Sequence, residues 1–306
     1  MQAKFLISLV FFAVAHSVQA VEVAFKPIAP GIYAFIGETE GRTYGNEGLN
    51  ANMGLVTTNA GAVLIDSGAS FEGARQIAEA ARKATGQSIK WVINTGGQDH
   101  RWLGNGFFAA QGAEIIAHQD ALPDMKARAL EHANALTPVL KEKFNGTVPV
   151  YPTRLLTGES NRLELGGVVL EVKHARGGHT PGDSVVWLPE QRVAFSGDIV
   201  YVDRVLGLHP VSNSKRWVES FAMLEALNPR LIVPGHGAVT NLAQAQAQTR
   251  DLLLALRAHM AKAVDAGVDL GVAVKSFNAE PFKGLQHADV WIPQLANQTY
   301  LEMEKE

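Results

Sequence analysis

The segment GGHTPGDSVVWLPEQRVAFSGD, residues 177–198, contains a glycine-rich turn, two apolar runs and a closing acid. The apolar runs are short and are bounded by Gly, Pro and Asp, which predicts two successive β-strands. His179 stands beside glycine before the first run, and Asp198 ends the second run in the same way. A side chain at such a strand end is little crowded, and sheets build sites where several strand ends converge. The segment therefore predicts a β-rich fold that carries its chemistry at strand ends.

Strands and helices alternate on both sides of this segment. Short apolar runs bounded by turn residues predict further strands within residues 25–37, 53–68, 89–95, 112–118, 162–175 and 230–237. Capped or Ala- and Leu-rich stretches predict helices at residues 70–86, 119–143, 214–227 and 242–266. Two β-rich halves, each followed by helices, predict two packed sheets with helices outside them. We expect one domain over residues 21–306, with a helical appendage from about residue 242.

Composition limits the chemistry that this fold can carry. The chain has 306 residues, of which 47% are hydrophobic, so it can bury a full core. Its net charge of -3 gives no electrostatic basis for binding nucleic acid or an anionic membrane, so small-molecule partners are expected. Cysteine is absent, which excludes Cys-ligated zinc, iron–sulfur clusters and a cysteine nucleophile. A metal would have to be held by histidines and carboxylates.

The first twenty residues have the pattern of a secretory signal peptide. Lys4 supplies the positive charge, FLISLVFFAVA the apolar region, and VQA a small-residue cleavage site that ends at Ala20. The apolar run is too short to cross a bilayer. We therefore expect cleavage before Val21, export to a bacterial periplasm, and no membrane insertion of the mature chain.

Three further histidines share the setting of His179 at predicted strand ends. They are His100 in QDHRW, His236 in VPGHG and, less clearly, His174 in VKHARGG. A single loop histidine is more often hydrogen-bonded or solvated than a ligand, so only the set as a whole points to a metal. Outside the set, we expect His132 on the surface and Trp102 in the core.

The order of these motifs resembles that of the metallo-β-lactamase-fold hydrolase superfamily. VLIDSG (Asp66), GGHTPGD (His179), FSGD (Asp198) and VPGHG (His236) occur in the family's order, and the resemblance runs from Asn52 to Gly237. It implies an α/β fold of the αββα sandwich type, with two mixed β-sheets flanked by helices. The signal peptide, INTGGQDHRWLGN and the Tyr-x-Glu-x-Glu ending resemble, more narrowly, the quinoprotein relay-system zinc metallohydrolases. These are exported relatives associated with pyrroloquinoline-quinone enzymes.

The loop NTGGQDHRWLGN, residues 94–105, departs from the family's His-x-His-x-Asp-His pattern. A gapless match places Gly96 and Gln98 at the first two histidines, His100 at the aspartate and Arg101 at the last histidine. A shift by one residue instead keeps Asp99 and His100 as the Asp-His pair. Length favours the first alignment and chemistry the second. Both remove the two histidines that help to bind the first metal.

The resemblance therefore implies an asymmetric ligand set. The first metal would keep only His179, and one imidazole is too few, because zinc sites use at least three protein ligands. The second would keep His100, Asp198 and His236, with Asp99 as a candidate fourth ligand. Two imidazoles, a carboxylate and an open position suit one hydrolytic zinc, and iron is the alternative metal.

Two functions follow from this set. The first is an exported hydrolase with one metal that acts on an ester, thioester or lactone-like carbonyl, with Asp198 or Asp99 as the base. The second is a non-catalytic binding or accessory protein for a periplasmic quinoprotein or its cofactor. The retained ligands favour the hydrolase, and the missing histidines favour the binding protein.

Overall fold

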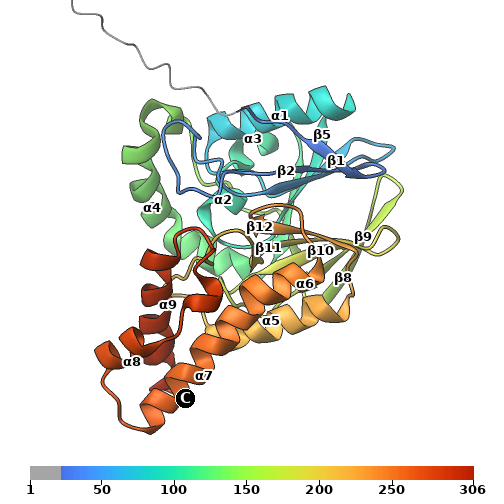
Figure 1. Cartoon of the computed structure of the whole chain (residues 1–306). Coiled ribbons are helices and arrows are strands. Elements are labelled where there is room, and N and C mark those ends of the chain that lie inside the picture. Colours follow the sequence, from blue (N-terminus) through green and yellow to red (C-terminus); the bar gives the residue numbers. More distant parts are fainter. Residues whose placement is uncertain (1–21) are drawn as a thin grey trace, which may run out of the picture.

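Two β-sheets pack face to face and helices cover both outer faces, as seen in the computed structural model of the chain (Figure 1). This is the αββα sandwich that the sequence predicts, and the prediction is confirmed. The structure describes residues 22–306. The expected signal peptide and its cleavage site after Ala20 lie outside the described residues.

The first sheet contains seven strands in the order of the chain, β1 to β7. Strands β1 to β4 pair antiparallel, and β4 to β7 pair parallel. Parallel strands place their carboxyl ends at one edge, which is where β5 delivers the loop after Asn94. The strands are β1 (Lys26–Ala29), β2 (Ile32–Phe35), β3 (Met53–Val56), β4 (Ala62–Ile65), β5 (Ile89–Asn94), β6 (Glu114–His118) and β7 (Arg154–Leu156).

The second sheet contains five strands in the order β12-β11-β10-β9-β8. Strands β8 to β11 pair antiparallel, whereas β11 and β12 run parallel and carry Asp198 and His236. Apolar side chains of both sheets, such as Ile65 and Phe195, meet in a core between the two layers. The strands are β8 (Ser160–Leu165), β9 (Val168–His174), β10 (Ser184–Leu188), β11 (Val193–Tyr201) and β12 (Leu231–His236).

The helices follow local signals closely. Helix α1 begins after Ser70, whose side chain accepts from the Gly73 amide, and ends at Gly86 in the left-handed conformation. The helices are α1 (Phe71–Thr85), α2 (Asp99–Trp102), α3 (Asn105–Ala110), α4 (Ala121–Leu140), α5 (Ser214–Ala226), α6 (Leu242–Ala245), α7 (Asp251–Asp265), α8 (Leu270–Ser276) and α9 (Ala288–Met303). Short 3-10 segments follow at Lys141–Phe144 and Glu280–Phe282, and a π-helical turn at Gln246–Arg250 joins α6 to α7.

The C-terminal helices share a core with the second sheet. Leu253 of α7 and Leu295 of α9 are buried in one cluster with Val200 of β11 and Phe221 of α5. In Figure 1, α7 runs below the second sheet and α9 turns back towards the end of the sandwich where α2 and α4 lie. The segment after residue 242 therefore covers the fold and also reaches its functional edge.

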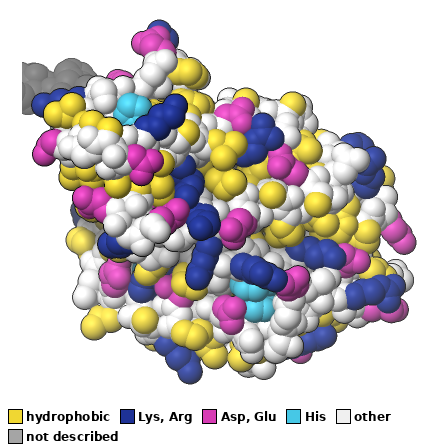
Figure 2. Space-filling model, turned by 90° about the horizontal axis from the view of Figure 1, so that it is seen from below, with side chains coloured by type: hydrophobic (Ala, Val, Ile, Leu, Met, Phe, Trp, Pro, Cys, Tyr) yellow, Lys and Arg dark blue, Asp and Glu magenta, His cyan; other side chains and the backbone are white. Residues whose placement is uncertain are grey.

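The described surface is mixed in charge. On the face shown in Figure 2, acidic, basic and apolar side chains are interspersed, and no broad basic area of the kind that nucleic acid needs is visible on that face. None of the helices within residues 22–306 has both the length and the apolar character required to cross a membrane.

Candidate metal centre

The loop after β5 is buried and tightly held. The Asn94 side chain donates to the Arg101 carbonyl at 2.7 Å and to Asn105 Oδ1 at 3.0 Å, which closes the loop around the short helix α2. Asp99, His100 and Arg101 are all at most 4% exposed. Such burial of three polar residues requires partners, which are Asp198 of the second sheet, Asp66 after β4 and Arg42 from the loop before β3.

Three of the predicted ligands meet at the common end of the two sheets. His100 Nε2 lies 3.0 Å from Asp198 Oδ2, and His236 Nε2 lies 3.5 Å from Asp198 Oδ1. One ligand atom from each of these residues lies within 4.8 Å of the other two. They come from α2, β11 and β12, whose ends the sandwich brings together.

His179 joins this group from the GGHTPGD turn. Its Nδ1 lies 3.5 Å from Asp198 Oδ2 and has no hydrogen-bond partner among the described residues. Burial lowers the pKa of His179 well below its usual value, so the ring is neutral at pH 7. The turn is braced by Asp183, which accepts from the Thr180 amide at 2.8 Å. A neutral, unpartnered ring nitrogen therefore faces the carboxylate.

The hydrogen bonds of His236 fix which of its nitrogens carries a lone pair. Its Nδ1 lies 2.8 Å from the Asn50 carbonyl, an acceptor, so Nδ1 must carry the proton. Burial lowers the pKa of His236 well below its usual value, which leaves Nε2 unprotonated. Nε2 and Asp198 Oδ1 then face each other as two acceptors at 3.5 Å. A cation between them would remove this repulsion, so the donor set fits a metal ion.

Asp99 does not join the group. It begins α2, and successive side chains of a helix project roughly 100° apart, so Asp99 and His100 point in different directions. Asp99 Oδ1 instead lies 3.1 Å from His100 Nδ1, behind the ring, and pairs with Arg42. Asp99 was predicted as a ligand and base; its position is that of a group that orients His100.

Arg101 occupies the space around Asp198. Its guanidinium donates to both oxygens of Asp198, and its Nη1 donates to Asp66 Oδ2 at 2.9 Å. Burial alone would raise the pKa of Asp198, but Arg101, His100 and His179 outweigh it and hold that pKa well below its usual value. Burial does raise the pKa of Asp66, against the opposing effect of Arg101. A fixed side-chain cation thus compensates two buried carboxylates.

These contacts agree with the gapless alignment of the loop, in which His100 and Arg101 stand at the two second-metal positions. Both contact Asp198, and Asp99 does not. The loop also has little room for the missing histidines. A Cβ at Gly96 would lie 2.9 Å from Asp183 Oδ1, and one at Gly97 would overlap the Asp124 carboxylate. Gln98 is held by Arg128, whose Nη1 donates to its Oε1 at 3.1 Å.

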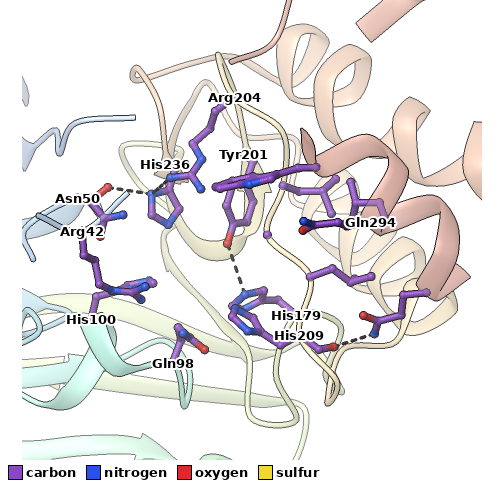
Figure 3. A pocket seen from close by; sticks show the side chains of 16 residues that line it. Arg42, Asn50, Gln98, His100, His179, Tyr201, Arg204, His209, His236 and Gln294 are labelled. Atoms are coloured by element: carbon purple, nitrogen blue, oxygen red, sulfur yellow. Dashed lines mark hydrogen bonds between the residues drawn. The ribbon is translucent and has the colours of Figure 1, made fainter. Parts of the chain in front are cut away.

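A cavity of about 400 Å³ opens above the ligands (Figure 3). His100, His179 and His236 line it, and Arg42, Arg204 and His209 surround them. Helix α9 supplies part of the wall through Trp291, Gln294, Leu295 and Gln298. Neither Arg42 nor α9 could be assigned to the site from the sequence, because each lies outside the motifs.

Sequence and structure comparisons place this geometry in a known family. The model of the metallo-β-lactamase superfamily matches residues 46–236. The chain belongs to the metallo-β-lactamase superfamily. Two relatives are metallo-β-lactamases type 2: that of Bacillus sp. (strain 170) is 27% identical and that of Bacillus cereus 26%. Each match covers 66% of this chain and 72% of the relative.

Solved structures of the superfamily share the fold. A metallo-β-lactamase from Pontibacter korlensis is 21% identical with a TM-score of 0.57, over 73% of this chain and 95% of that chain. The inverting sec-alkylsulfatase Pisa1 from Pseudomonas sp. is 16% identical with a TM-score of 0.72. That match covers 91% of this chain and half of the sulfatase. The fold is thus shared by proteins that are named for different hydrolytic reactions.

His174 lies outside this superfamily site. Its ring stacks on that of His118, with centroids 3.6 Å apart, and its Nε2 lies 3.1 Å from Asp120 Oδ2. These three residues line a separate cavity beside β9 and α4. Another histidine, His132, was predicted on the surface, and this is wrong. It is 3% exposed, because the face of α4 that carries it packs towards Trp102, which is in the core as predicted.

Proposed function

We propose that this protein is a hydrolase that uses one divalent cation, zinc or alternatively iron, and acts on an ester, thioester or lactone-like carbonyl. The observation that carries the proposal is the pair of facing acceptors, His236 Nε2 and Asp198 Oδ1. Arg101 donates to Asp198 Oδ1 and compensates its charge, so the member of the pair that no hydrogen-bond donor meets within residues 22–306 is His236 Nε2, whose lone pair would face the cation. His179 adds a second ring nitrogen, Nδ1, which has no hydrogen-bond partner among the described residues.

His100, Asp198 and His236 would hold the ion, with His179 as the fourth candidate. The Nδ1 of His100 lies 2.8 Å from Arg42 Nη2, so Nε2 carries the proton and donates to Asp198. To bind a metal, His100 would have to transfer its proton to Nδ1. Asp99 at 3.1 Å is placed to accept it, in the arrangement common behind metal-binding histidines.

A bound zinc ion would lower the pKa of its coordinated water to about 7 and polarise the carbonyl. Asp198 and Asp99 are poor candidates for the base. Arg101 and its neighbouring histidines hold the pKa of Asp198 low against burial, and Arg42 and His100 do the same for Asp99. A carboxylate with a lowered pKa accepts a proton weakly. Their role in this proposal is to hold and orient the ligands.

A second candidate function rests on Arg101. Because its guanidinium already compensates Asp198 and Asp66, the site can be electrically balanced without a metal. This favours a binding or accessory protein that uses the cavity without catalysis. The two functions differ in metal content, which can be measured directly.

The test is elemental analysis of the mature protein, purified without chelators and supplied with zinc. The hydrolase requires close to one ion per chain, lost in His236→Ala and retained in His259→Gln, because the His259 ring lies away from the site, beside the Ala273 carbonyl, Ser276 and Phe277. His174→Ala reports on any ion held by the separate cluster. No ion in the wild type, or one that depends on His174 alone, would exclude the hydrolase and leave the binding function.

Export and association with a periplasmic quinoprotein complete the proposal. The sequence of residues 1–20 and the loop resemblance support them. Deleting the gene and measuring a periplasmic quinoprotein dehydrogenase, with and without added cofactor, tests the association. Unchanged dehydrogenase activity in the deletion strain would remove it.

A further inference from the structure

Arg204 is a buried cation without an acidic partner. It follows β11 in the chain and is 4% exposed. No carboxylate oxygen within residues 22–306 lies within 4.0 Å of its guanidinium, and its Nε has no hydrogen-bond partner there. Its Nη1 lies 3.3 Å from His236 Nδ1, but that nitrogen carries a proton for the Asn50 carbonyl and cannot accept.

The other buried arginines near the site are compensated. Arg101 pairs with Asp198 and Asp66, and Arg128 pairs with Asp124. Burying a charge without a partner is strongly unfavourable, so a guanidinium in this state does not stabilise the fold. What holds it is mainly the face of Trp291, whose ring centre lies 4.5 Å from the guanidinium carbon.

The guanidinium is also correctly placed to meet a ligand. Arg204 lines the cavity beside His236 and Tyr201, and these three lie together along one side of it (Figure 3). Leu206, Leu208 and Leu295 add apolar surface to the same cavity. A ligand that enters would therefore meet an unpaired positive charge next to a candidate metal ligand.

We propose that Arg204 anchors an oxyanion, a carboxylate or a sulfate, that the substrate carries close to its reacting group. A guanidinium presents paired N–H donors that match such an anion, and it remains charged at neutral pH. The identification of the ligand as a substrate rests on the proposed hydrolase function. Anion binding itself does not, so the two can fail separately.

This assignment gives the C-terminal helix a role in selecting the ligand. The superfamily match ends at residue 236, and Trp291 lies on α9, well beyond it. Trp291 holds the guanidinium in place through its ring face, and Gln294 and Gln298 line the cavity nearby. The anion subsite is thus assembled from the segment that follows β11 and from a segment outside the matched region.

The experiment is calorimetric titration of the full mature protein with glutarate and, separately, with inorganic sulfate at low ionic strength. At least one anion should bind the wild type. The dissociation constant of that anion should rise about tenfold or more in Arg204→Gln, which loses a charge-assisted hydrogen-bonded pair, and should rise less in Arg204→Lys. Arg230→Gln, which removes an exposed guanidinium, should bind like the wild type. Binding of glutarate would indicate a carboxylate ligand, and binding of sulfate would indicate a sulfate ligand.

Thermal melting of the same variants separates binding from a structural role. Arg204→Gln should melt no lower than the wild type in the absence of anion, because it removes an uncompensated buried charge. It should also lose the rise in melting temperature that the anion gives the wild type. Equal affinity in wild type and Arg204→Gln, no binding of either anion by the wild type, or a clearly lower melting temperature in Arg204→Gln would each overturn the proposal.

Discussion

Removing the Arg101 guanidinium should expose how much of the site's stability depends on it. Arg101→Met keeps the length of the side chain but leaves the carboxylates of Asp198 and Asp66 buried without their cation. Breaking a buried ion pair by removing one partner costs about 3–5 kcal/mol. For a chain of this size, that corresponds to a drop in Tm of roughly 5–8 °C. The matched control is Arg75→Met, whose exposed pairs with Glu72 and Glu79 should contribute less than about 1 kcal/mol.

The loss of stability in Arg101→Met should depend on pH in a defined direction. In the wild type, the lowered pKa of Asp198 means that its stabilisation is present above its unfolded pKa and is lost only in strong acid. In Arg101→Met, burial dominates and raises the pKa of Asp198 and Asp66 above their unfolded values. Both then gain protons as the pH falls, and protonation relieves the unpaired charge. The difference between wild type and variant should therefore narrow from pH 8 to pH 5.

Urea unfolding at 25 °C, followed by circular dichroism at several pH values, measures the loss of stability in the variant and its change with pH. Breaking a buried pair typically costs about 3–5 kcal/mol. If the free energy of unfolding of Arg101→Met falls by less than about 1 kcal/mol at pH 7, the role given to Arg101 is refuted. A difference that stays constant between pH 8 and pH 5 would show that the loss is one of packing, not of charge compensation.

Three other predictions concern the core, the turn and the N-terminus. Burial lowers the pKa of His132 to about 4. The free energy of unfolding should therefore fall by up to about 3 kcal/mol as the pH falls from 6.5 to 4, because only the unfolded chain takes up the proton in this range. His132→Leu should remove that part of the pH dependence in urea titrations. Gly178 has φ +148, and a Cβ added there would lie 3.0 Å from Trp217 Cα. Gly178→Val should therefore lower the free energy of unfolding by about 1–3 kcal/mol. The control is Gly41→Ala, which adds a Cβ in open space and should have little effect on the urea midpoint. Intact-mass analysis of periplasmic protein should identify Val21 as the first residue; a full-length product would contradict export.

The fold could be predicted because its signals are local. The cap at Ser70, the left-handed Gly86 and the short apolar strands are set by neighbouring residues, and the structure has each element where the sequence predicts it. Weaker elements were missed. Strand β7, with only three residues, and helix α9 depend on packing against the rest of the fold.

The site was predictable only in its motif residues. His179, Asp198 and His236 stand at strand ends, and such positions are visible in the sequence. Their electrostatic partners are not. Arg42 reaches the site from a loop before β3, and Arg101 forms ion pairs with Asp198 and Asp66. Side-chain direction decides these contacts, and spacing along one chain does not reveal it.

The packing around Gly96 makes the change in this loop difficult to reverse in evolution. A histidine there would have to displace the carboxylate of Asp183, which is tied to the Thr180 amide and supports the turn of His179. Restoring the family pattern would also require histidines in place of Gln98 and Arg101, and loss of Arg101 alone leaves two acids uncompensated. Each intermediate would be less stable than the present chain, since no single step restores the ligands of the first metal. Descendants of this protein are therefore expected to elaborate the cavity wall and α9 while the loop stays as it is.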